Sequence, residues 1–267
     1  MGRILTKSGI AAGRACELRA LRTLIHGDWG TAPLPPPQAS LVRYRARHSA
    51  LASLHRLRLA RAVVDVASLP LLWSHAWRSS GGTGEPPADG LAWLQGYLVD
   101  NPFLNVGAER VLVAVERTLR AQYLGRMWQA RPDLLVRGPD GAIEALELSS
   151  ARSPLSNRSQ VDTMVAINLL VMSGLDMPET LRQLPHRVII CTLDDYREIN
   201  VSMERVVARE ILGNIATWLD GLTPDTAQPA PSLDTCSGCS FRDTCAFALA
   251  VDPAVTESTV VDVPVAF

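Results

Sequence analysis

Four cysteines with the spacing of a shared metal site would bring the two ends of this chain together. Three of them stand close in the stretch CSGCSFRDTC, as Cys236, Cys239 and Cys245, and Cys16 lies near the opposite end. Two thiolates separated by two residues can bind one metal, because a turn points both sulfurs inward. A structural zinc site usually uses two such close pairs, whereas a three-plus-one division suits a cubane with four separate iron corners. The spacing therefore favours a 4Fe-4S cluster, with a zinc site or no metal as the alternatives.

The rest of the cysteine usage fits a reducing compartment. Cys191 lies in the apolar stretch VIICTL and is expected to be a small core residue. The N-terminus lacks the apolar core of a signal peptide, and no later segment approaches a membrane span of ~20 apolar residues. We therefore expect a cytoplasmic protein, in which cysteines serve as metal ligands or free thiols instead of forming disulfides.

The charge of the chain is nearly balanced but unusual in kind. The 267 residues carry a formal net charge of -1, which neither demands nor forbids a nucleic-acid partner. Lys7 is the only lysine, and every other basic residue except histidine is arginine. A role that requires lysine could therefore fall only to Lys7 or be taken by an arginine.

The hydrophobic pattern changes from helical to mixed along the chain. Residues 8–26 and the arginine-rich stretch 39–77 have apolar positions at helical spacing. Residues 110–125 then read as a strand, and the pattern after them alternates strands with helices. We expect an α/β protein in three parts: residues 1–107 as a helical region with the first cluster ligand, 108–222 as the α/β core, and 223–267 as a cluster-binding segment and tail.

A hairpin is expected in the middle of this core. The stretches ARPDLLVRG and AIEALELSS read as two strands, and PDG between them is typical of a tight turn. A helix over SQVDTMVAINLLVMSGL, a buried strand over HRVIICTLDDY and an amphipathic helix over SMERVVAREILGNIATWLDGL should follow.

Two stretches resemble one family. LTKSGIAAGRACELRALRTL is similar to the N-terminal helix with a lone cysteine, and CSGCSFRDTC to the C-terminal triplet, of the iron-sulfur RecB-like nucleases of the PD-(D/E)XK superfamily. That family includes the AddB nuclease domain and CRISPR-associated RecB-like exonucleases. The resemblance implies a restriction-endonuclease-like core, in which helices flank a mixed central sheet, and a 4Fe-4S cluster on Cys16, Cys236, Cys239 and Cys245.

The resemblance also implies a site for divalent metal. Asp133 and Glu147 match the family's two metal-binding carboxylates, and Glu116 resembles its preceding-strand glutamate. His48 or His55 would be the upstream histidine, with His48 taken as the metal ligand. Hard Mg or Mn ions prefer oxygen ligands, and in such sites they activate water and stabilise the transition state of phosphodiester cleavage.

The departures from the family pattern concern catalysis. Ser149 stands where the family has a lysine, and losing one such electrostatic contact commonly costs about 10² to 10³ in rate. The family's Gln-x-x-x-Tyr signature keeps Gln160 but has Met164 in place of the aromatic residue. Arg152 could supply a substitute cation, or it could be an ordinary surface arginine.

The sequence therefore predicts a metal site that can form beside impaired catalytic machinery. We expect an iron-sulfur protein that binds DNA, as single strands or ends, with metal-dependent phosphodiester hydrolysis weakly retained or lost. Arginines between residues 43 and 61 would contact phosphates and bases, or simply form a solvated helix face. The alternatives are a pseudo-nuclease that acts as a DNA clamp or assembly partner, and new chemistry on the nuclease fold.

Overall fold

The computed structural model describes residues 4–28, 30–31, 39–100, 103, 110–149 and 154–249. Within these ranges the chain begins with a short strand and helices, and a second group of helices follows. The first group comprises β1 (Ile4–Thr6), α1 (Lys7–Ala15), α2 (Glu17–Ala20) and the π-helical turn η1 (Leu21–His26). The second group comprises α3 (Ala39–Leu59), the 3-10 turn η2 (Val66–Ser68), α4 (Leu69–Ser79) and α5 (Ala88–Asp100).

The strands form two sheets. The larger has the order β2-β5-β6-β7-β8, in which only the β6–β7 pair is parallel. Its strands are β2 (Val111–Val115), β5 (Leu134–Arg137), β6 (Ile143–Ser149), β7 (His186–Thr192) and β8 (Glu198–Val201). The smaller sheet has the order β1-β4-β3 and contains β3 (Leu119–Tyr123) and β4 (Arg126–Ala130). The expected α/β class with mixed strand directions is confirmed.

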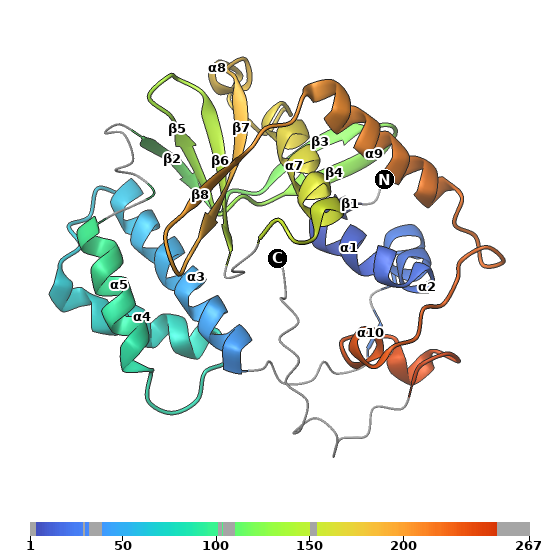
Figure 1. Ribbon diagram of the computed structural model, residues 1–267, viewed down its shortest axis with the longest axis horizontal. Coiled ribbons are helices and arrows are strands. Elements are labelled where there is room, and N and C mark those ends of the chain that lie inside the picture. The colour runs from blue at the N-terminus through green and yellow to red at the C-terminus, as the bar shows by residue number, and fades with distance from the viewer. Residues whose placement is uncertain are drawn as a thin grey trace.

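Helices cover both faces of the larger sheet. Figure 1 shows α3, α4 and α5 on one side, and α7 (Arg158–Met172) and α9 (Arg205–Asp220) on the other. Strand β6 lies between two hydrophobic clusters: Ala145 packs towards α7, whereas Leu146 and Leu148 pack towards α3 and α5. All seven residues of β6 are consequently buried, as expected for a strand covered on both faces. Any polar side chain on β6 must therefore find its partners inside the protein.

The predicted hairpin is confirmed, and two longer elements are broken. Gly141 turns between β5 and β6 at φ 83°, a left-handed conformation that favours glycine. The single strand expected over 110–125 was wrong, because the chain turns at Glu116 and forms β2 and β3. The helical stretch 39–77 is likewise divided into α3 and α4.

The N-terminal helix predicted over 8–26 is interrupted at Cys16. Its backbone is extended there (φ -156°, ψ 111°), between α1 and α2. The two helices then lie so close that a Cβ on Gly13 would come within 2.8 Å of Ala20 Cβ. Cys16 therefore occupies a bend and not the middle of a helix.

Of three further sequence expectations, one has an outcome. Cys191 is buried in β7, as expected of a core residue. Arg152 lies outside the described residues. The division at residues 107/108 and 222/223 stays a prediction. Among the described helices, none is both long enough and apolar enough to cross a bilayer.

The helical layer contains a buried histidine whose charge is excluded. His55 Nε2 lies 2.7 Å from Tyr97 Oη, and both side chains are buried. Burial, with the nearby positive charge of Arg58, lowers the pKa of His55 to about 3. Folding therefore favours neutral His55, and the corresponding stability is lost as pH falls from the ordinary pKa of 6.5 towards 3.

We expect the unfolding free energy of the wild type to fall by about 2 kcal/mol from pH 7 to pH 5 because of His55. The slope is about 1.4 kcal/mol per pH unit below 6.5. In urea denaturation, His55→Gln should lack this loss. The unfolding free energy of the wild type minus that of the variant should therefore decrease by that amount from pH 7 to pH 5. His26→Gln, at an exposed histidine, serves as the control. A difference between wild type and His55→Gln that stays constant with pH would contradict the expectation.

Candidate active site

The hairpin brings the two predicted carboxylates together. Strands β5 and β6 pair with Leu134 opposite Leu146, so the same antiparallel register sets Asp133 opposite Glu147. Asp133 Oδ2 accepts a hydrogen bond from the Leu148 backbone N–H at 2.6 Å. The Glu147 side chain is only 1% exposed. Glu147 thus lies in the interior and Asp133, 13% exposed, lies mostly covered beside it, where an unpaired charge would be costly.

Helix α3 adds one of the two candidate histidines. His48 Nε2 lies 2.8 Å from Asp133 Oδ1, and its Nδ1 lies 4.0 Å from Glu116 Oε1. His55, two turns further along α3, instead contacts Tyr97 inside the helical layer. Of the two histidines, the structure therefore places His48 beside the carboxylates.

The unexpected member of the site is Lys7. It is the first residue of α1, and its Nζ donates a hydrogen bond to Glu147 Oε2. Strand β1 pairs with β4 immediately before it, and Thr6 caps α1 by accepting a hydrogen bond from Gly9 N at 3.1 Å. A lysine thus reaches the carboxylates from 140 positions earlier in the chain. The sequence has Ser149 at the position where the family has its lysine, and it indicated Lys7 only because Lys7 is the single lysine of the chain.

Two neutral side chains complete the surroundings, and sequence reasoning missed both. Asn168 of α7 donates from Nδ2 to Glu147 Oε1 at 2.7 Å and is fully buried. Tyr44, one turn before His48 on α3, donates from its hydroxyl to Leu148 O at 3.0 Å. The available signals were an asparagine on an apolar helix and a tyrosine four positions before a histidine, and neither is specific.

The other predicted residues lie at the edge of this group. Ser149 is buried at the end of β6, two positions past Glu147 and on the same face. Glu116 lies at the turn after β2 and forms ion pairs with Arg56 and with Arg131, the latter at 2.6 Å. Gln160, in the first turn of α7, lines a cavity that Lys7 also lines.

The environment moves the pKa values of the two carboxylates apart. Burial raises the pKa of Glu147, and the charge of Lys7 only partly opposes this effect. Burial acts in the same direction on Asp133, but the charge and hydrogen bond of His48 outweigh it and lower the pKa of Asp133. Asp133 is therefore the more firmly ionised member of the pair.

The pKa values of the two basic partners, Lys7 and His48, are both raised. Burial lowers the pKa of Lys7, but the negative charges of Glu147 and Asp133 outweigh it and the net pKa is raised. The pKa of His48 is also raised, because the charge of Asp133 exceeds the effect of burial. Lys7 therefore stays protonated at neutral pH and can act as a fixed positive charge but not as a base.

The side chains present suit a site in which a hard divalent cation is bound by two carboxylates, waters and substrate. They do not suit a site closed by protein ligands alone. In the described part of the chain, no three His, Cys, Asp or Glu side chains converge in an arrangement that could hold a metal ion. Mg²⁺, however, is commonly bound through one or two carboxylates together with waters and substrate phosphates. Asp133 and Glu147, side by side on paired strands, satisfy that requirement.

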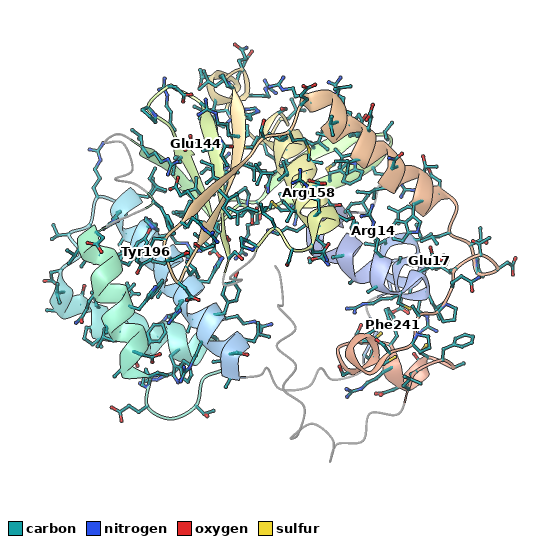
Figure 2. All side chains as sticks on the ribbon, in the orientation of Figure 1. Arg14, Glu17, Glu144, Arg158, Tyr196 and Phe241 are labelled. Carbon is teal, nitrogen blue, oxygen red and sulfur yellow. The ribbon has the colours of Figure 1, made fainter. Side chains whose placement is uncertain are left out.

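The predicted cysteine ligands lie in two segments that contact each other. Arg22 Nη1 of η1 donates to Thr244 Oγ1 at 3.1 Å, and its guanidinium carbon lies 5.0 Å from the centre of the Phe241 ring. A Cβ on Gly30 would come within 2.3 Å of Ser240 O. Figure 1 shows the C-terminal helix α10 (Leu233–Ser237) below α2, and Figure 2 shows Phe241 on the same side as Glu17. The segments that follow Cys16 and Cys239 are therefore neighbours.

The free cysteines do not themselves form a metal site in this structure. Cys236 is buried, whereas Cys16, Cys239 and Cys245 are partly exposed. The packing of their segments agrees with the sequence expectation that both chain ends meet, but the four sulfurs are not gathered around one point.

The strength of the Lys7–Glu147 contact can be measured in a double-mutant cycle. We expect Lys7→Met and Glu147→Gln to be coupled by about 2 kcal/mol in unfolding free energy without metal, because removing one partner leaves a buried group without its counter-charge. Urea denaturation in EDTA gives the four free energies. The exposed pair Arg43–Asp89, with Arg43→Met and Asp89→Asn, should show coupling of at most about 1 kcal/mol. Equal coupling in both cycles would contradict a strong buried contact.

Comparisons with known proteins give limited similarity. No family model matches the sequence, and no curated protein matches it. Among solved structures, a protein from Eubacterium rectale described as a putative exonuclease is similar at 12% identity, covering 97% of this chain and 94% of that one, with a TM-score of 0.48. The protein SSO0001 is similar at 12% identity, covering 78% of this chain and 86% of that one, with a TM-score of 0.33. Both TM-scores are below 0.5, and the function of this protein is inferred below from the geometry of its site.

Proposed function

We propose that this protein is a metal-dependent nuclease that acts on DNA strands, with a restriction-endonuclease-like core and with Lys7 as its catalytic lysine. One observation carries the proposal: the Lys7 ammonium contacts Glu147 beside the Asp133 carboxylate. The electrostatic group that Ser149 cannot supply is present, but it comes from the start of α1. The presence of this ammonium group therefore favours retained over impaired hydrolysis.

Asp133 and Glu147 would hold the divalent metal in this proposal. Bound Mg²⁺ would supply Lewis-acid stabilisation of a phosphoryl oxygen and a water of lowered pKa. Asn168 and the Leu148 backbone N–H hold one oxygen each of Glu147 and Asp133, at 2.7 and 2.6 Å. The two carboxylates are thereby kept in fixed orientations, which reduces the reorganisation required when the substrate binds.

Lys7 would stabilise negative charge on the reacting phosphate, and His48 would orient Asp133 beside it. Lys7 is held protonated by the carboxylates and is 24% exposed, so its ammonium can face both Glu147 and a ligand. His48 binds Asp133 and orients that carboxylate from the opposite side. A fixed ammonium can stabilise negative charge that develops on a phosphate oxygen, and such contacts commonly contribute about 10² to 10³ in rate.

The 4Fe-4S cluster belongs to the same proposal. Cys16, Cys236, Cys239 and Cys245 would hold it, and the contacts of η1 with residues 240–244 support this assignment. Cluster binding requires a further approach of the four thiolates, which metal binding can drive because ligand binding and folding are coupled. A cytoplasmic location would keep the thiols reduced until they bind iron.

DNA, as single strands or ends, is the proposed substrate because a divalent metal at Asp133 and Glu147 would act on phosphodiesters, and Lys7 adds a positive charge to this site. Arginines of α3 provide part of the positive charge around it, but Arg47 and Arg56 already contact Asp194 and Glu116. These pairs reduce the charge that the helix presents. A phosphate-binding role is therefore assigned more readily to residues around Lys7 than to α3 as a whole.

The cleavage assay uses end-labelled single- and double-stranded DNA with Mg²⁺ or Mn²⁺ and anaerobically purified protein. We expect wild type to cleave, Asp133→Asn and Glu147→Gln to lose activity, and Lys7→Met to lose about 10² to 10³ in kcat. Ser149→Lys should not raise the rate, because Glu147 already has an ammonium partner.

Two results of this assay would oppose the proposal. Cleavage by Lys7→Met at the wild-type rate would remove Lys7 from catalysis. No cleavage by wild type, together with activity in Ser149→Lys, would identify a pseudo-nuclease with an intact carboxylate pair. Arg78→Gln, at an exposed residue of α4, controls for nonspecific loss of positive charge.

The cluster assignment is tested by substituting each proposed ligand. We expect Cys16→Ser to lose the visible absorbance of the cluster and its bound iron, as Cys236→Ser should, because each thiolate holds one iron corner. Cys191→Ala should retain both signals, since Cys191 lies in the core. Iron and sulfide analysis of the purified proteins provides the measurement. Cluster content that is unchanged in Cys16→Ser would refute the three-plus-one ligand set.

A further inference from the structure

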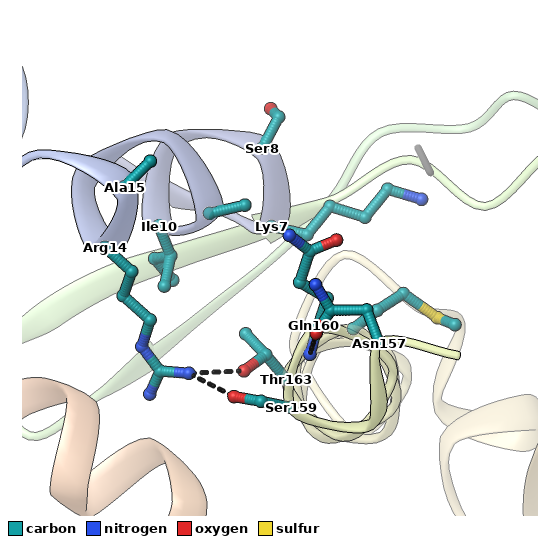
Figure 3. A pocket seen from close by; sticks show the side chains of 11 residues that line it. Lys7, Ser8, Ile10, Arg14, Ala15, Asn157, Ser159, Gln160 and Thr163 are labelled. Atoms are coloured by element: carbon teal, nitrogen blue, oxygen red, sulfur yellow. Dashed lines mark hydrogen bonds between the residues drawn. The ribbon is translucent and has the colours of Figure 1, made fainter. Parts of the chain in front are cut away.

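A cavity lies between the length of α1 and the first two turns of α7, and Lys7 is part of its lining. Its volume is about 270 Å³, and Figure 3 shows Lys7 near one end and Arg14 near the other. The α7 side contributes four polar side chains, of Asn157, Ser159, Gln160 and Thr163, beside Met164, and the α1 side adds the apolar Ile10, Ala11 and Ala15. The cavity is smaller than the ~300–1,000 Å³ of pockets that bury drug-sized ligands. It therefore fits a compact polar group better than a large cofactor.

The charges around this cavity favour an anion. Its lining residues include Lys7 and Arg14 but no aspartate or glutamate. Helix α7 presents its first turn to the cavity, with Asn157 as its N-cap, whereas α1 lines it from Lys7 at its first residue to Arg14 in its last turn. The positive end of the α7 dipole adds to the two side-chain cations. Such a combination is suited to a phosphate group.

Arg14 is already oriented for this task. Its Nη1 donates to Ser159 Oγ at 2.8 Å and to Thr163 Oγ1 at 3.5 Å, as Figure 3 shows. These contacts tie one nitrogen of the guanidinium to α7, and a guanidinium carries five N–H donors in a fixed plane. The fork can therefore bind a phosphate in a defined direction without first losing much side-chain freedom.

Lys7 joins this cavity to the carboxylates. The same side chain lines the cavity and contacts Glu147. A nucleic-acid strand whose reacting phosphate lies at Asp133 and Glu147 would have its neighbouring phosphates on one side close to Lys7. The cavity is the positively charged space that begins there.

We propose that the α1–α7 cavity binds one phosphate of the DNA strand, next to the phosphate that is cleaved, and that Arg14 is its principal contact. This inference rests on the proposed nuclease function and names a part of its substrate site. The chemistry recognised is a phosphate anion, which a strand or free inorganic phosphate can provide. The two sources are separated by the experiment.

The first arm measures binding of inorganic phosphate by isothermal titration calorimetry to metal-free wild type, Arg14→Gln and Arg78→Gln. We expect Arg14→Gln to weaken binding about tenfold, because a charge-assisted contact is lost. Arg78→Gln should bind as wild type does, since Arg78 is exposed on α4 and is not among the residues that line the cavity. Equal phosphate affinity in wild type and Arg14→Gln would overturn the proposal.

The second arm uses single-stranded oligonucleotides that carry one uncharged methylphosphonate at successive positions, bound without divalent metal so that no strand is cut. One position should weaken binding about tenfold in wild type and have little effect in Arg14→Gln. A series in which every position affects both proteins equally would overturn the assignment to a strand phosphate.

The cleavage assay separates the two proposals. Cleavage by wild type with phosphate binding independent of Arg14 would refute the cavity and leave the nuclease. Arg14-dependent binding of inorganic phosphate and of one strand position, in a protein that cleaves nothing, would support the cavity and refute the nuclease. Arg14→Lys, which keeps the charge but not the fork, should restore part of the phosphate affinity and shows that loss in Arg14→Gln is not due to unfolding.

Discussion

The structure depends on the compensation of two carboxylates inside the protein. Asp133 and Glu147 are brought together by a local hairpin, and each ion taken out of water costs several kcal/mol unless it is paired. Neither basic partner comes from the hairpin: Lys7 is the first residue of α1 and His48 lies on α3. The helical segments on both sides of the sheet are therefore required electrostatically as well as for covering its apolar faces.

One N-terminal segment meets several of these requirements. Pairing of β1 with β4 and capping by Thr6 fix the start of α1, where Lys7 stands. Packing of α1 against α7 closes the cavity that Arg14 lines. The chain then bends at Cys16 and continues into η1, which contacts residues near Phe241. The charge of the site and the meeting of the chain ends thus depend on one short stretch.

Local patterns predicted the parts of this arrangement that are local. The PDG turn, the strand over β6 and the apolar periods of α7 and α9 each arise from neighbouring residues, so they could be identified from the sequence. The strand expected over 110–125 failed because the chain turns at Glu116, at φ 45°, although the polar stretch 116–118 contains no glycine or proline to mark a turn. The contact between Lys7 and Glu147 spans 140 positions, and no periodicity reports it. The family motif has its cation on the same strand as Glu147, whereas the chemistry requires only a cation close enough to contact the carboxylates.

The position of Lys7 couples the two chain ends to the site. Helix α1 has nine residues, fewer than the ~12–15 that an isolated helix needs to be even marginally stable in water. It therefore depends on tertiary contacts at both ends: β1 and the carboxylates at Lys7, and the packing around Cys16 at the other. Glu17, just past that bend, accepts hydrogen bonds from Trp218 Nε1 at 3.0 Å and from Gln228 N at 3.1 Å, which already tie this end to the C-terminal part of the chain. A cluster on Cys16 would strengthen the same anchorage, so its effect on catalysis would pass through the placement of α1 and need not involve electron transfer.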